Sequence, residues 1–223
     1  MKLKGEVISI SNSSDPYPRI EATTRLTRKC LEILVGSNCK IQVITKSNIV
    51  VRDDDLLSRT KATVALTITT DDENTSKLLE TAAPPISERL RAAQELINKG
   101  IAVSVRIDPI VPLINDQPEK LIKTLAAMGV KHITSSTYKL KPDNWRRFCQ
   151  AFPTVAEKLK SLYFQEGEKI GGSILLPREV RYKLMKNMRD LVTASGMKFG
   201  VCRENLAQLN TASCDGSWLL NTQ

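Results

Sequence analysis

The stretch ATVALTITTDD, residues 62–72, carries the pattern on which the predicted fold depends. Its apolar and β-branched residues, Ala62–Thr69, are typical of a buried β-strand. Hydroxyl and carboxylate side chains take over at Thr67–Asp72, the carboxyl end of that strand. A strand that ends in this way presents polar side chains at one edge of a sheet, where they can contact a ligand.

Short β-rich runs of this kind recur along the chain. The other runs are Glu6–Ile10, Lys40–Thr45, Ile101–Ile107, Lys131–Thr134 and Met197–Val201. Segments with helical spacing lie between them, and Gly36, Gly100 and Gly129 stand where three of these helices would end. Strand, helix and strand at this spacing predict right-handed βαβ units around a parallel sheet.

The carboxyl ends of the predicted strands favour a barrel over an open sheet. No glycine-rich phosphate loop follows any strand, so the usual nucleotide site of open α/β folds is absent. Instead, nearly every strand is followed by polar residues: Ser11–Asp15, Thr45–Ser47, Thr67–Asp72, Asp108 and Ser135–Thr137. Such residues can simply cap the helices that follow. As a set, they equally indicate a shared site at one end of a barrel.

The charge of the chain is positive and unevenly distributed. The formal net charge is +9, and residues 158–198 hold nine Lys or Arg against four acidic residues. A polyanionic partner such as nucleic acid would suit this excess, whereas solvated helix faces would explain it equally well. The sequence contains neither a run of eighteen apolar residues nor a signal peptide pattern, which predicts a soluble cytoplasmic protein.

The cysteines and the single histidine match no common metal or disulfide pattern. The five cysteines at positions 30, 39, 149, 202 and 214 contain no CxxC pair. Cys30 falls on the apolar side of a predicted helix and is expected in the core. His132 stands beside an apolar strand without the partners of a zinc site or a catalytic triad, so we interpret it as structural or surface-exposed.

The last third of the chain differs in character from the first part. Long basic helical stretches, Thr154–Phe164 and Pro177–Ser195, are followed by one strand and an irregular polar tail, Glu204–Asp215. We therefore predict a barrel over residues 1–150 and a helical C-terminal extension with a tail over residues 151–223.

Six segments, in this order, resemble one known family. They are SNSSDPYPRIE (11–21), LTRKCLEIL (26–34), VITKSNIVVRDDDLL (43–57), ALTITTDDE (65–73), LETAAPPISERLRAAQELINKGI (79–101) and VRIDPIVPLIND (105–116). They are similar to radical S-adenosylmethionine proteins of the group related to spore photoproduct lyase, also called DNA repair photolyases. The resemblance covers roughly residues 5–150 and implies a partial (β/α)6 barrel, S-adenosylmethionine as cofactor and a [4Fe-4S] cluster.

The family's cluster loop, CxxxCxxC after its first strand, has no counterpart in this sequence. Three thiolates of that loop hold the cluster and leave one iron open for the cofactor. Because the resemblance begins at the family's second strand, we expect a fragment, a split-gene product or a degenerate paralogue. The cluster segment would then come from a separate chain. Without the first βα unit, Val7–Ile10 would form an apolar edge strand open to pairing with another chain.

The resemblance also assigns candidate site residues. The expected cofactor contacts are Ser13, Ser14, Lys46, Thr67, Thr69 and Arg89, since hydroxyls and cations suit a zwitterionic methionine moiety. Substrate-side candidates are Asp15, Tyr17, Asp108 and Tyr138. Cys202 and Cys214 could help to hold a second cluster, relay a radical or be buried thiols. Spore photoproduct lyase carries a hydrogen-donor cysteine where this sequence has only serines, which argues against thymine-dimer reversal by that route.

Two other classes of function stay open at this stage. The chain could be a non-catalytic barrel remnant that binds nucleic acid or a partner protein. It could also be an ordinary barrel enzyme that uses Lys46, Asp108 and nearby carboxylates as acid and base. Loss of S-adenosylmethionine binding in a Lys46→Ala variant would favour the radical S-adenosylmethionine interpretation over the ordinary barrel enzyme.

Overall fold

Six parallel strands form the central sheet of the computed structural model, which describes residues 5–10 and 14–221. The strands lie in the order β1 (Val7–Ile10), β2 (Lys40–Thr45), β3 (Ala62–Thr67), β4 (Ala102–Ile110), β5 (His132–Thr137) and β8 (Lys198–Val201). Each pairs in parallel with the next. This arrangement confirms the predicted α/β fold class and the predicted strands.

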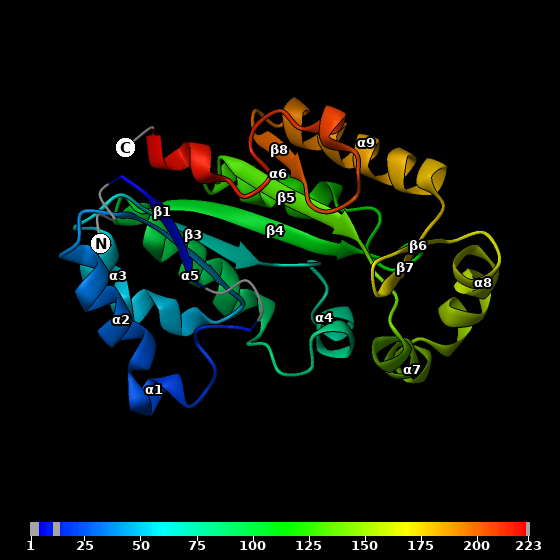
Figure 1. Ribbon diagram of the computed structural model, residues 1–223, viewed down its shortest axis with the longest axis horizontal. Helices are drawn as coiled ribbons and strands as arrows, with labels where there is room; N and C mark the ends of the chain where they lie inside the picture. The colour runs from blue at the N-terminus through cyan, green and yellow to red at the C-terminus, as the bar shows by residue number, and fades with distance from the viewer. Residues whose placement is uncertain (1–4, 11–13, 222–223) are drawn as a thin grey trace.

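Helices connect the strands, and three of them end within two residues of Gly36, Gly100 and Gly129, as predicted. They are α1 (Glu21–Thr24), α2 (Leu26–Val35), α3 (Asp54–Leu57), α4 (Glu73–Leu79), α5 (Ile86–Asn98), α6 (Glu119–Ala127), α7 (Pro142–Ala151), α8 (Pro153–Phe164) and α9 (Arg178–Ala194), with a 3-10 helix η1 (Asn48–Asp53) before α3. A two-stranded antiparallel hairpin, β6 (Glu168–Ile170) and β7 (Ser173–Leu175), lies between α8 and α9 and was not predicted from the sequence. In Figure 1 the strand arrows of β4 and β5 point towards the side of the molecule that carries α4, α7 and this hairpin.

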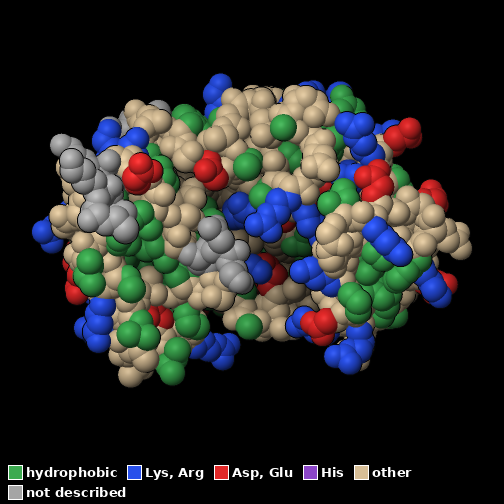
Figure 2. All heavy atoms as spheres, viewed as in Figure 1, with side chains coloured by type: hydrophobic (Ala, Val, Ile, Leu, Met, Phe, Trp, Pro, Cys, Tyr) green, Lys and Arg blue, Asp and Glu red, His purple; other side chains and the backbone are tan. Residues whose placement is uncertain are grey.

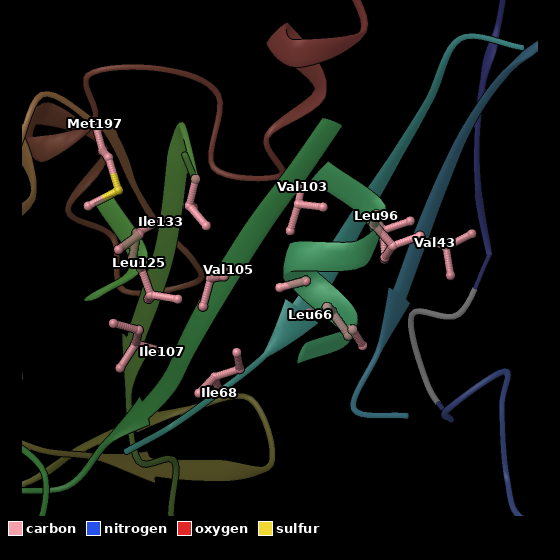
Figure 3. Close-up of a cluster of buried hydrophobic side chains, with 14 of the residues drawn as sticks. Val43, Leu66, Ile68, Leu96, Val103, Val105, Ile107, Leu125, Ile133 and Met197 are labelled. Carbon is pink, nitrogen blue, oxygen red and sulfur yellow. The ribbon is translucent and has the colours of Figure 1, made fainter. Parts of the chain in front are cut away.

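The main core lies between the sheet and its helices. Alternate strand residues such as Val43, Leu66 and Val105 point to this side and pack with Leu96 of α5 and Leu125 of α6 (Figure 3). Burial of each such side chain contributes about 1.5–3 kcal/mol to folding. A second cluster joins α7, α8 and the hairpin around Phe148, Leu159 and Leu176. No helix among the described residues is long and apolar enough to cross a membrane.

The opposite side of the sheet, here called the inner face, is polar. Its residues alternate with the core residues along each strand and include Gln42, Thr67, Arg106, Asp108, His132 and Thr134. Buried polar groups need partners, because leaving one unsatisfied costs about 1–3 kcal/mol. On the inner face, the hydroxyls of Thr63 and Ser104 have no partner among the described residues, whereas the groups below do.

The C-terminal tail covers the half of the inner face at the amino ends of the strands. The Gln42 amide donates to the carbonyl of Asp215 at 2.5 Å, and the Thr134 hydroxyl donates to that of Cys214 at 2.7 Å. The backbone approaches so closely that a Cβ added at Gly200 would lie 2.5 Å from the Cα of Cys214. The tail includes the 3-10 helices η2 (Ala207–Leu209) and η3 (Ser217–Asn221), so the last segment of the chain completes the sheet's polar lining.

His132 connects the tail to β5. The ring is fully buried and accepts a hydrogen bond at Nδ1 from the indole N–H of Trp218 at 3.0 Å, while Nε2 lies 3.1 Å from the Thr134 hydroxyl. The hydrogen bonds assign the proton to Nε2, since Nδ1 already faces a donor. Burial lowers the pKa of His132 to about 4. Of the two interpretations of His132, the structural one is confirmed and the surface-exposed one is wrong.

The free energy of unfolding should therefore fall as the pH drops from about 6.5 to about 4. In that window the unfolded chain binds a proton at His132 that the folded protein does not, so stability rises with pH and is complete above the unfolded pKa. The difference between the two pKa values corresponds to about 3 kcal/mol. Urea unfolding of the wild type and a His132→Gln variant across this range measures it. Parallel pH profiles for the two proteins would contradict the assignment.

Candidate functional site

The uncovered half of the inner face opens into a cavity of about 700 Å³ at the carboxyl ends of the strands. Residues from the exit of every strand of the sheet line it, together with the tail. Figure 2 shows Lys and Arg side chains gathered around the hollow at the centre of this face. The basic lining residues are Lys46, Arg106, Lys139 and Arg203, and the acidic ones are Asp15, Asp108 and Asp215.

Asp15 fixes the exit of β1 against the exit of β2. Its Oδ1 accepts hydrogen bonds from the Thr45 hydroxyl at 2.6 Å and the Tyr17 amide at 2.9 Å, and its Oδ2 accepts from the Lys46 amide at 2.7 Å. Because two of these three donors belong to the end of β2, the carboxylate holds the segment around Asp15 against that strand end. Ser14, one residue earlier, is exposed and lines the cavity.

Lys46 reaches the cavity from the end of β2 and is held by a buried carboxylate. Its Nζ lies 3.0 Å from Oε1 of Glu80, an ion pair that lacks hydrogen-bond geometry. The other oxygen of Glu80 accepts from Arg89 Nη1 at 2.7 Å and from the Thr69 hydroxyl at 3.0 Å. The Lys46 side chain remains 44% exposed, so its ammonium has N–H groups left for a ligand.

Arg89 is fully buried behind this pair. Its guanidinium donates to the carbonyl of Thr67 at 2.9 Å and to the hydroxyl of Ser76 at 2.6 Å, in addition to Glu80. These bonds attach α4, α5 and the end of β3 to one another. Arg89 and Thr69 therefore influence the position of Lys46 through Glu80. Neither residue lines the 700 Å³ cavity.

A second chain of polar contacts crosses the cavity floor from β4 to β5. The Asp108 carboxylate accepts from Arg106 Nη2 at 2.6 Å and from the Ser136 hydroxyl at 2.5 Å. Lys139 donates to that hydroxyl at 2.7 Å and to Glu204 at 2.9 Å. Burial opposes the charge of Arg106, but its pKa lies above the ordinary value because the Asp108 carboxylate and the Cys202 thiol favour the cation.

The cavity brings together most, but not all, of the sequence-predicted site residues. Those that line it are Ser14, Asp15, Lys46, Thr67, Asp108, Tyr138, Cys202 and Cys214. Ser13 lies outside the described residues. Tyr17 is only 2% exposed and donates its hydroxyl proton to Asp53 at 3.0 Å, and burial together with that carboxylate raises its pKa.

Three cations of the cavity, Arg106, Lys139 and Arg203, were not predicted from the sequence. Arg106 could have been found, since it stands two residues before Asp108 on the same strand face. Lys139 and Arg203 follow the ends of β5 and β8, and no sequence motif around them marks them as site residues. Arg203 is exposed, has a left-handed backbone with φ of 58°, and forms no ion pair with another described residue.

The cysteines do not fit an iron–sulfur cluster within the described part of the chain. Over residues 5–10 and 14–221, no group of three or more His, Cys, Asp or Glu side chains is placed to hold a metal ion. Cys202 and Cys214 are free thiols at the cavity, and burial raises the pKa of Cys214. Cys39 is buried, whereas Cys30 is exposed on α2, so its expected place in the core was wrong.

Comparison with known sequences gives distant relatives. No family model matches the chain. An uncharacterized protein of Acidianus two-tailed virus is 32% identical over 139 residues, which are 58% of this chain and 45% of that protein. A radical SAM Nalpha-GlyT isomerase of Pseudomonas phage M6 is 24% identical over 201 residues, 87% of this chain and 42% of that protein. The chain spans about half the length of the curated relatives it matches.

Comparison with solved structures gives a similar fold. Spore photoproduct lyase complexed with dinucleoside spore photoproduct has a TM-score of 0.67 at 16% identity, covering 89% of this chain and 61% of that one. A double mutant of that lyase with bound AdoMet and the dinucleoside has a TM-score of 0.61 at 15% identity, covering 86% and 58%. The chain thus has the α/β fold of radical S-adenosylmethionine enzymes and is similar in sequence to one such isomerase.

The buried pair of Glu80 and Arg89 leads to a prediction about stability. A Glu80→Ala variant should lose about 3–5 kcal/mol of unfolding free energy, because it leaves the Arg89 cation buried without its carboxylate. Urea unfolding measures the loss. A double variant, Glu80→Leu with Arg89→Met, should recover most of it.

The matched control for this loss is Glu95→Ala, which removes an exposed ion pair with Arg91. That change should cost less than about 1 kcal/mol. An equal loss in Glu80→Ala and Glu95→Ala would contradict a special role for the buried pair.

Proposed function

We propose that this chain binds S-adenosylmethionine in the cavity at the carboxyl ends of its strands and forms the cofactor-binding part of a radical S-adenosylmethionine enzyme. The observation that carries the proposal is the convergence of Ser14, Lys46 and Thr67 on one polar cavity of about 700 Å³. The likeness of the fold to a lyase structure with bound AdoMet supports it.

The donors of the cavity suit the methionine moiety of the cofactor. The Lys46 ammonium, held in place by Glu80, would bind the α-carboxylate by a charge-assisted hydrogen bond. The hydroxyls of Ser14 and Thr67 can both donate and accept, and would bind the carboxylate and the amino group. Ser13 belongs to the same proposed set. When bound, S-adenosylmethionine would supply the chemistry that abstracts a hydrogen atom from a substrate.

Thr69 and Arg89 would contribute to this site by positioning. Both contact Glu80, and Glu80 is the carboxylate beside the Lys46 ammonium. A change at either residue would alter where the ammonium lies, without removing a direct contact to the ribose or the carboxylate.

The cluster that such an enzyme needs would come from outside the described residues. The described cysteines, acids and histidine do not fit a [4Fe-4S] cluster, so we derive no step through it. We propose that a further polypeptide segment, on a separate chain or a longer form of this one, supplies the three thiolates.

The cations at the cavity favour an anionic substrate. Lys46, Arg106 and Lys139 each have an acidic partner, whereas Arg203 is exposed and forms no ion pair within the described part of the chain. A phosphate of a nucleic acid would suit the Arg203 guanidinium, which binds phosphate oxygens in pairs. Asp108 and Tyr138 line the same cavity and would face that substrate. We propose DNA or RNA as the substrate class.

A non-catalytic barrel that binds nucleic acid is the second candidate. The free Arg203 and the net charge of +9 favour it equally, because neither requires a cofactor. The two candidates differ in whether the chain binds S-adenosylmethionine.

A Lys46→Ala variant should bind S-adenosylmethionine about tenfold or more weakly than the wild type. The expected loss is that of one charged hydrogen bond, about 1.5–3 kcal/mol. Isothermal titration calorimetry measures it, with Lys120→Ala as the matched control because that side chain is 85% exposed and pairs only with Asp71 among the described residues. Salt-dependent DNA binding without any S-adenosylmethionine binding by the wild type would favour the second candidate.

Anaerobic reconstitution with iron and sulfide should give no stoichiometric [4Fe-4S] absorption in this chain alone. The reason is that its described residues do not bring three thiolates together. Ultraviolet–visible absorption with iron and sulfide analysis checks the outcome. A full cluster that responds to S-adenosylmethionine would show that the chain holds its own cluster and would overturn the proposed external segment.

A further inference from the structure

A second cavity lies at the amino ends of the strands, away from the cavity in which we place the cofactor. Its volume is about 810 Å³. The residues that line it come from the segments that lead into β1, β2, β3 and β4 and from the ends of α2 and α3. The two cavities share no lining residue and lie at opposite ends of the parallel strands.

The charged residues that line this second cavity are all basic. They are Lys40, Arg59, Lys61 and Lys99, and none of its described lining residues is acidic. The cavity at the carboxyl ends differs, because three aspartates line it together with its cations. Cations that line a concave surface without carboxylates create a positive potential that attracts anions.

Arg59 and Lys61 have no acidic partner in the described part of the chain. Both side chains are exposed, and neither forms an ion pair with another described residue. They flank Thr60 in the short segment between α3 and β3. A guanidinium can bind two oxygens of one phosphate group, and an ammonium binds phosphate oxygens as a compact charge.

The other two cations are oriented by protein groups. The Lys40 ammonium donates to the side-chain oxygen of Asn221 at 2.8 Å, and Lys99 pairs with Asp54. Because Asn221 is neutral, the charge of Lys40 is not offset by that contact. Three of the four cations therefore lack a carboxylate partner among the described residues.

The ends of the neighbouring helices do not account for these cations. Lysine and arginine often stabilise the unpaired carbonyls at a helix C-terminus. At the end of α2, the Leu34 carbonyl already accepts from the Ser37 amide at 3.0 Å and from the Ser37 hydroxyl at 2.7 Å. At the end of α5, the Ile97 carbonyl accepts from the Gly100 amide at 2.9 Å. The cations are thus left for another anion.

The backbone leaves open space in this cavity. Gly5 and Gly100 line it with φ of 83° and 76°, and a Cβ added at either would have no heavy atom within 4 Å. The volume lies within the range of about 300–1,000 Å³ that is usual for small-molecule sites.

We propose that the cavity at the amino ends of the strands binds a small molecule that carries at least two linked phosphate groups. Arg59 and Lys61 would contact the phosphate oxygens directly, and Lys40 would add a third charge. One phosphate group carries only about −1.5 to −2, which leaves three uncompensated cations unmatched. A nucleic acid strand would call for a groove that tracks its backbone, whereas these cations line one concave cavity. The inference does not depend on S-adenosylmethionine chemistry.

Isothermal titration calorimetry of the full chain with inorganic pyrophosphate and with ATP, without divalent metal ions, tests the inference. Each should bind at one site per chain, and adenosine, which has no phosphate, should not bind. A double variant, Arg59→Gln with Lys61→Gln, should weaken both phosphate ligands by about tenfold or more, because it removes two charge-assisted contacts.

The matched control is the double variant Lys29→Gln with Lys123→Gln. It removes the same net charge from two exposed lysines that form no ion pair within the described part of the chain, and neither lines the cavity. The control should bind pyrophosphate as tightly as the wild type does.

Several results would overturn the inference. They are no saturable binding of pyrophosphate or ATP at up to about 1 mM, adenosine binding as tight as that of ATP, and equal weakening in the two double variants. A DNA oligonucleotide that binds through Arg59 and Lys61 while pyrophosphate and ATP do not would also overturn it. S-adenosylmethionine titrated in parallel separates the two proposals, since pyrophosphate binding without cofactor binding would contradict only the proposed function.

Discussion

The polar inner face of the sheet is the constraint on which the rest of the structure depends. The strands alternate core residues with residues that face inwards, and many of the inward residues carry amides, hydroxyls or charges that need partners. At the amino ends of the strands the C-terminal tail provides them, through the carbonyls of Cys214 and Asp215 and the indole of Trp218. At the carboxyl ends the same kind of lining stays open to solvent as a cavity. The need for partners thus accounts for the hydrogen bonds that hold the tail on the sheet.

The charged residues of that cavity are positioned by carboxylates from distant parts of the chain. Glu80 holds Lys46, and Glu204 holds Lys139. Asp15 accepts two hydrogen bonds from the end of β2, one from the Thr45 hydroxyl and one from the Lys46 amide. This arrangement keeps the cations in place before a ligand arrives, which lowers the entropy lost on binding. It also gives Asp15 a structural role, since its carboxylate accepts hydrogen bonds from the end of β2.

The likeness to spore photoproduct lyase concerns the fold, since the identity is 15–17% for the structures compared. The chemistry of a related enzyme does not follow from it, and the described cysteines do not gather at one place. What the structure adds is a cavity with suitable donors at the carboxyl ends of the strands.

The sequence by itself determined the six parallel strands, their order along the chain and the polar ends that mark the site. These features are local, because alternating apolar residues, glycines at helix ends and β-branched runs indicate the same element whatever packs around them. It also allowed Ser14, Lys46 and Thr67 to be predicted together. Only the tertiary structure decided how the partners meet, because Glu80, the C-cap residue of α4, holds Lys46 from a distant part of the chain and no sequence motif marks it as a partner. The exposure of Cys30 was likewise decided there, since helical periodicity identifies an apolar side but not whether another element covers it.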